Sequence, residues 1–131
     1  MVARRTPTKL LVLVVEDEPG LRELYRSTLT IAGYAVVAVD DGIDALRLID
    51  LGPAPHAVVL DMALPRLSGF DVQRELHAHD ATRDIPIVVV TGADTRINEK
   101  EFACVLRKPI KPEALVAAVE QCLRRFGMLY L

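Results

Sequence analysis

Polar side chains of complementary chemistry follow four of the apolar runs in this sequence. They are Glu16 and Asp17 after the first run, then Asp61, Thr91 and Lys108 after three later ones. Carboxylates brought close together repel one another unless a cation joins them, and oxygen ligands with room for water suit Mg²⁺. A hydroxyl and an ammonium group are what a tetrahedral dianion needs as donor and point charge. The residue types therefore predict a Mg²⁺ site that handles a phosphoryl group.

Each member of this set has an expected role. Asp61 is the predicted nucleophile, and a carboxylate that attacks phosphorus gives an acyl phosphate. Asp17 and Asp61 are expected to bind Mg²⁺ directly, whereas Glu16, which is one carbon longer, is expected to act through a bound water. Thr91 and Lys108 are expected to receive the phosphoryl oxygens, and the metal and Lys108 to stabilise charge during transfer.

The apolar runs that precede these residues are predicted strands. They are short, rich in valine and leucine, and apolar on both faces, as expected for a parallel sheet covered on both sides. The predicted strands are Lys9–Val15, Ala35–Val39, Ala57–Leu60, Ile87–Val90 and Ala103–Leu106. In such sheets the ligand site lies at the carboxyl ends of the strands. The fold would thus bring the polar side chains to one edge.

Helical patterns of period 3.6 lie between the strands, so a doubly wound α/β domain is expected. Asp40 or Asp41 is predicted to begin the second helix, and Ser68 to cap the third. Gly33 is expected to end the first helix, and Pro112 suits the first turn of the last one.

Length and composition exclude several classes of protein. The 131 residues fit one domain, with 51% apolar residues, 26% charged residues and a net charge of −2. The sequence has no cluster of basic residues of the kind that binds nucleic acid directly. The apolar run Leu10–Val15 is too short for a secretory signal or a membrane span. Cys104 and Cys122 are predicted to be free, buried thiols. We expect a cytoplasmic protein with a flexible leader (1–8), one domain (9–126) and a tail (127–131).

On these residues the chain resembles the receiver domains of two-component response regulators over about residues 9–126. The motifs are the acid pair, the acceptor Asp61 followed by Pro65 and Gly69, then Thr91 and the Lys108-Pro109 pair. The spacings of 44 residues from Asp17 to Asp61 and 30 from Asp61 to Thr91 are like those of the family. Taken together the motifs are highly specific.

The resemblance implies a flavodoxin-like five-stranded parallel sheet in the order 2-1-3-4-5. It implies a phosphoacceptor switch rather than an enzyme. A histidine kinase or histidine phosphotransfer protein would phosphorylate Asp61, and an unknown downstream protein would respond. It also implies that the Ala63 carbonyl binds the metal, that Thr91 acts in the switch and that the Lys108–Pro109 bond is cis. A homodimer is left open.

Two departures from the family pattern concern the output. Val105 stands where receivers usually have an aromatic residue, and Phe102 is expected to face the other way because it is out of register. Only 16 residues separate Thr91 from Lys108, so the fourth helix is expected to be shortened or disordered. Both features predict altered coupling to the usual output face.

Two alternatives remain open from the sequence. The first is a receiver-like scaffold that binds a partner without phosphorylation. The second is a phosphatase of the haloacid-dehalogenase type, which also places an Asp, a Ser or Thr and a Lys after strands. Those enzymes normally carry a second acid two residues after the nucleophile, and here that position is Ala63.

Overall fold

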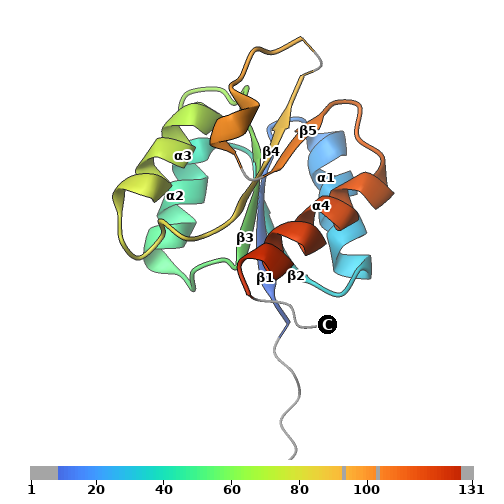
Figure 1. Cartoon of the computed structure of the whole chain (residues 1–131), viewed down its shortest axis with the longest axis horizontal. Coiled ribbons are helices and arrows are strands. Elements are labelled where there is room, and N and C mark those ends of the chain that lie inside the picture. Colours follow the sequence, from blue (N-terminus) through green and yellow to red (C-terminus); the bar gives the residue numbers. More distant parts are fainter. Residues whose placement is uncertain (1–8, 93, 103, 128–131) are drawn as a thin grey trace, which may run out of the picture.

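A five-stranded parallel sheet forms the centre of the computed structural model, which describes residues 9–92, 94–102 and 104–127. Its strands lie in the order β2-β1-β3-β4-β5, which confirms the predicted flavodoxin-like topology (Figure 1). The strands are β1 (Leu11–Val15), β2 (Ala35–Val39), β3 (Ala57–Asp61), β4 (Ile87–Thr91) and β5 (Cys104–Arg107). The predicted leader (1–8), Ala103 and residues 128–131 of the predicted tail lie outside the described residues.

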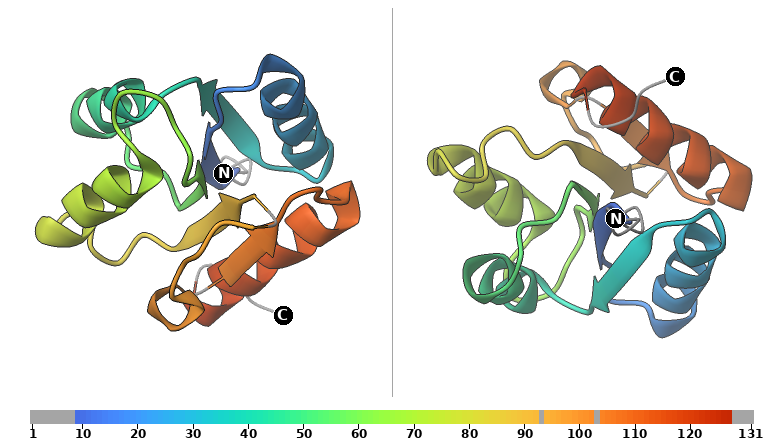
Figure 2. Two further views of the ribbon diagram at one scale, coloured as in Figure 1. Left: turned by 90° about the horizontal axis from the view of Figure 1, so that it is seen from above. Right: turned by 90° about the horizontal axis from the view of Figure 1, so that it is seen from below.

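Helices cover both faces of the sheet, as Figure 2 shows from its two ends. The helices α1 (Pro19–Ile31) and α4 (Pro112–Arg125) pack on one face, in a core that contains Tyr25 and Val119. The helices α2 (Gly42–Leu51) and α3 (Gly69–Ala78) pack on the other face. None of the helices in the described ranges is long and apolar enough to cross a lipid bilayer.

The ends of the helices follow from local side chains. Asp41 caps α2 by accepting a hydrogen bond from the amide of Asp44, and Ser68 forms a capping box with Asp71 before α3. Gly33 follows α1 with a φ of 107°, a conformation that glycine adopts without steric cost. The predicted starts of the second and third helices are therefore confirmed.

The connection from β4 to β5 is the least regular part of the fold. Among its described residues, the helical part is a single turn of 3₁₀ helix, η1 (Glu99–Glu101). The predicted shortening of the helix between the fourth and fifth strands is therefore confirmed. Ile97, Phe102 and Val105 pack against the same core cluster, on the α2–α3 face of the sheet. The prediction that Phe102 faces away from Val105 was wrong, because Phe102 precedes β5 and strand alternation does not govern it.

Candidate functional site

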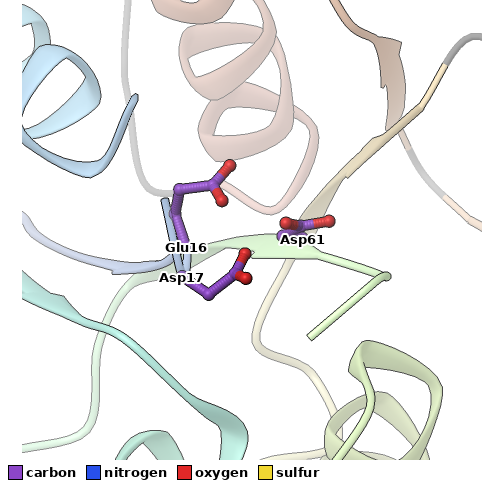
Figure 3. A group of neighbouring side chains, drawn as sticks. All are labelled: Glu16, Asp17 and Asp61. Carbon is purple, nitrogen blue, oxygen red and sulfur yellow. The ribbon is translucent and has the colours of Figure 1, made fainter. Parts of the chain in front are cut away.

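Three carboxylates meet at the carboxyl edge of the sheet. Glu16 and Asp17 directly follow β1, and Asp61 is the last residue of β3, the strand beside it. Each side chain offers a ligand atom, and these three atoms all lie within 4.8 Å of one another (Figure 3). Glu16 and Asp61 are buried, at 1% and 3% exposure, whereas Asp17 is exposed. The cluster thus has a buried floor and one side open to solvent.

Lys108 brings a positive charge into this cluster from the far edge of the sheet. Its Nζ lies 2.8 Å from Glu16 Oε1 and 3.2 Å from Asp61 Oδ2. Its backbone amide donates a hydrogen bond to the Thr91 carbonyl oxygen at 2.8 Å, and the Lys108–Pro109 peptide bond is cis. The close contact with Glu16 was not foreseen, because sequence spacing cannot say which carboxylate an ammonium group reaches first.

Burial governs the charge state of the cluster. It raises the pKa of Glu16 to about 7, although hydrogen bonds from Lys108 and the Glu18 amide oppose the rise. Burial acts to lower the pKa of Lys108, but Glu16 and Asp61 outweigh it, so this pKa is raised. One ammonium group therefore leaves negative charge unbalanced, and three oxygen ligands of this kind fit a hard divalent cation.

Thr91 ends β4 at the same edge, with no exposed surface. Its hydroxyl oxygen has no hydrogen-bond partner within the described part of the chain, and the same holds for the buried hydroxyl of Tyr25 in α1. A buried polar group without a hydrogen-bond partner lowers the stability of the fold, so such a group is a candidate for binding a ligand. Tyr25 had no place in the predicted site, and only its helical position indicated burial.

The loop after β3 holds Asp61 in place. The backbone amide of Ala63 donates a hydrogen bond to Asp61 Oδ1 at 3.0 Å. A Cβ atom on Gly69 would lie 2.4 Å from the Asp61 carbonyl oxygen and 2.6 Å from the Met62 Cα, so only glycine allows this close return of the chain.

An ion pair also fastens this loop to α2. Arg66 has a φ of 62°, in the left-handed region, and its guanidinium pairs with the Asp41 carboxylate, whose residue is 4% exposed. The sequence identified Asp41 only as a helix cap. Its second partner lies 25 positions away in a loop without periodicity, so no sequence signal pointed to it.

Arg107 secures the chain on the other side of the site. Its guanidinium donates hydrogen bonds to the carbonyl oxygens of Gly92 and Thr95, at 3.3 and 2.7 Å, and pairs with Glu99 at 3.2 Å. Arg107 stands opposite Thr91 in the β4–β5 register. Sequence reasoning missed this residue, although it directly precedes Lys108.

The arrangement combines a buried carboxylate, oxygen ligands for a cation, an ammonium group and a buried hydroxyl. A carboxylate nucleophile with its charge offset in this way can attack an electrophilic phosphorus atom. The geometry brings Glu16, Asp17, Asp61 and Lys108 together, and it places Thr91 at the same edge. Val105 lies two residues before the end of β5 and packs into the core below.

Comparisons with known proteins show the family to which the chain belongs. Residues 12–120 match the response regulator receiver domain family. The response regulator MprA of Mycobacterium sp. (strain KMS) is 38% identical over 120 residues, which cover 87% of this chain and 50% of that protein. The chain thus spans about half the length of this curated relative.

Two solved structures have the same architecture. A response regulator receiver protein from Sinorhizobium medicae superposes with a TM-score of 0.79 at 29% identity, covering 90% of this chain and 97% of that one. The chemotaxis response regulator CheY4 of Vibrio cholerae superposes with a TM-score of 0.80 at 25% identity, covering 88% of this chain and 100% of that one. With its family match, fold and acidic edge, this chain belongs to the response regulator receiver domains of two-component signalling.

Proposed function

We propose that this domain is a phosphoacceptor switch that takes a phosphoryl group onto Asp61 from a histidine kinase or a histidine phosphotransfer protein. The observation that carries the proposal is the position of the Asp61 carboxylate. It is 3% exposed, lies among two other carboxylates and is 3.2 Å from the Lys108 ammonium group. A buried carboxylate with these neighbours is suited to act as a nucleophile toward phosphorus.

Transfer forms one bond and breaks another. A carboxylate oxygen of Asp61 attacks the phosphorus, the bond from phosphorus to the donor imidazole nitrogen breaks, and the nitrogen keeps the electron pair. Glu16, Asp17, Asp61 and the Ala63 carbonyl are the proposed holders of Mg²⁺, which would offset the charge of the phosphoryl oxygens when bound. The Ala63 amide and Lys108 orient the Asp61 carboxylate through its two oxygens.

Lys108 and Thr91 are the proposed receivers of the transferred group. Lys108 supplies a positive charge already at the carboxylate, with its side chain 25% exposed. The Thr91 hydroxyl, which has no partner among the described residues, would gain an acceptor when the phosphoryl oxygens arrive. These two residues therefore favour the phosphorylated form through charge and hydrogen bonding.

The output is proposed to run through the irregular β4–β5 connection. Thr91, the last residue of β4, directly precedes this segment, and Arg107 of β5 holds it with hydrogen bonds to Gly92 and Thr95. Val105 offers no aromatic ring to follow a movement of Thr91, so the segment itself is the proposed reader of the phosphorylated state. The downstream protein, the homodimer and the cytoplasmic location stay predictions.

The test is an intact-mass measurement after incubation with Mg²⁺ and acetyl phosphate. The wild-type chain is expected to gain one phosphoryl group, and Asp61→Asn none, because the amide is not a nucleophile. Asp80→Asn is the matched control, since Asp80 is an exposed carboxylate at the opposite end of α3 from Asp61.

Other results would identify the alternatives. An unmodified mass under conditions that phosphorylate a control receiver would favour the scaffold. Repeated turnover of a phosphomonoester such as p-nitrophenyl phosphate would favour a phosphatase. Phosphorylation of Asp61→Asn to the wild-type level would refute Asp61 as the acceptor.

A further inference from the structure

The two cysteines of the chain pack in the same part of the core, although 18 positions separate them. Cys104 begins β5 and Cys122 lies in the last two turns of α4, which packs against that strand (Figure 1). Cys122 belongs to the core cluster between the sheet and the α1–α4 layer, Cys104 packs against the same cluster, and both are free thiols. The sequence predicted free thiols, but it gave no sign that they meet.

The two thiols differ in exposure. Cys122 is 2% exposed within the core, among Val119, Leu123 and their neighbours. Cys104 is only half-buried, because β5 is an edge strand of the sheet. A reagent from solution therefore reaches Cys104 first, and Cys122 lies deeper, in the cluster against which Cys104 packs. The prediction of a buried thiol holds for Cys122, and for Cys104 only in part.

The interaction between the two thiols also makes their pKa values differ. The Cys122 thiol donates to the Cys104 sulfur and lowers the pKa of Cys104 to about 7, with a smaller contribution from the charge of Arg125 and against the effect of burial. The pKa of Cys122 is raised, first because it keeps the shared proton and second because it is buried. A half-buried thiolate beside a second thiol is the arrangement of oxidisable cysteine pairs.

We propose that Cys104 and Cys122 form a redox-active dithiol, which hydrogen peroxide oxidises to an intramolecular disulfide. The proposal does not depend on phosphorylation, because neither thiol belongs to the carboxylate site. Cys104 begins β5 and Lys108 directly follows the end of this strand, so the disulfide would tie the strand that positions Lys108 to α4.

The chemistry balances in two steps. The Cys104 thiolate attacks one peroxide oxygen, the O–O bond breaks, and the departing hydroxide takes a proton to become water. Cys104 is then a sulfenic acid. The Cys122 sulfur, having lost its proton, attacks the Cys104 sulfur, and the hydroxyl group leaves with that proton as the second water. Two thiols are thereby oxidised by two electrons, and one peroxide is reduced.

The first test uses the unaltered chain. It is treated with hydrogen peroxide, quenched, alkylated under denaturing conditions, weighed and digested with trypsin. We expect both cysteines to lose their alkylation and a disulfide to link peptide 101–107 to peptide 108–124, with full recovery after dithiothreitol. Persistent alkylation of both thiols, or a disulfide only between two chains, would overturn the proposal.

Two variants assign the roles of the thiols. Cys122→Ala is expected to stop at the sulfenic acid of Cys104, which dimedone traps. Cys104→Ala is expected to resist peroxide because the remaining thiol is buried. Circular dichroism shows whether each variant is folded, and the test on the unaltered chain stands without them.

The pH dependence of alkylation gives an independent reading. For the wild-type chain, the rate at Cys104 should rise with a midpoint near pH 7, following its thiolate. In Cys122→Ala the hydrogen-bond donor is lost, so the midpoint should move up toward the ordinary thiol range. The same midpoint in both proteins would show that the thiols do not interact, and would refute the paired site.

Discussion

Thr91 is completely buried, and its hydroxyl has no hydrogen-bond partner in the described part of the chain. Its contribution to stability can therefore be separated from its contribution to function. Valine has nearly the same shape without the hydroxyl. We expect Thr91→Val to leave the free energy of unfolding unchanged or to raise it by up to about 1 kcal/mol, because no hydrogen bond within the described residues is lost. Phosphorylation by acetyl phosphate should slow by about 100-fold, as for loss of one donor to a transition-state oxyanion.

Urea denaturation and the time course of the intact mass measure these two quantities. Thr91→Ser is the matched control, since it keeps the hydroxyl and should retain most of the phosphorylation rate. A variant Thr91→Val that is strongly destabilised but phosphorylated at the normal rate would show that the hydroxyl has a structural role instead.

Arg66 combines an ion pair with an unfavourable backbone conformation, and two substitutions separate these effects. Both Arg66→Ala and Arg66→Gly remove the ion pair with Asp41, but only glycine adopts a φ of 62° freely. We expect both variants to be less stable than the wild type, and Arg66→Ala to be less stable than Arg66→Gly by about 1 kcal/mol. Urea denaturation measures this difference. Equal stability of the two variants would show that the loop relaxes away from this conformation.

At the scale of elements, the side chain of Arg107 fastens the β4–β5 connection at several points. The guanidinium of Arg107 binds two carbonyl groups and Glu99, at 35% side-chain exposure. We expect Arg107→Ala to raise amide hydrogen exchange across residues 95–101 by about tenfold, with little change in the exchange of β1 and β3. Arg96→Ala, at an exposed position of the same segment, is the control and should leave exchange unchanged. A uniform increase over the whole sheet would instead indicate global destabilisation.

The main elements could be predicted because their signals are local. The apolar runs predicted both ends of each of the five strands to within one or two residues. Asp41, Ser68 and Pro112 indicated the starts of helices, which the structure confirms. The clustering of Glu16, Asp17, Asp61 and Lys108 could also be predicted, because the carboxyl ends of parallel strands meet at one edge.

Contacts between distant side chains could not be predicted in the same way. The pairing of Arg66 with Asp41 and the contact between Cys104 and Cys122 depend on how helices and loops pack, which periodicity does not encode. The position of Phe102 was missed for a related reason. Phe102 lies before β5, so the alternation of side chains along the strand does not fix the face on which it packs.

At the scale of the whole molecule, binding of Mg²⁺ should be linked to folding, because residues from β1 and β3 form the proposed site only in the folded chain. A ligand that binds only the folded state stabilises it by about 1.4 kcal/mol at ten times its dissociation constant. We therefore expect Mg²⁺ to raise the urea midpoint of the wild type. Asp17→Asn should abolish most of this increase, and Asp80→Asn should keep it. An equal response of Asp17→Asn and the wild type would place the ion elsewhere.

The position of Lys108 also has a consequence for the folding pathway. β5 is an edge strand, separated from β1 by β3 and β4. The Lys108 ammonium group therefore reaches the carboxylates only when β5 docks on the sheet. An intermediate that has paired β1 with β3 already brings the carboxylates together, and their repulsion lacks its counter-charge until then. Docking of β5 thus relieves an electrostatic penalty, which disfavours sheets that lack this strand and favours cooperative folding.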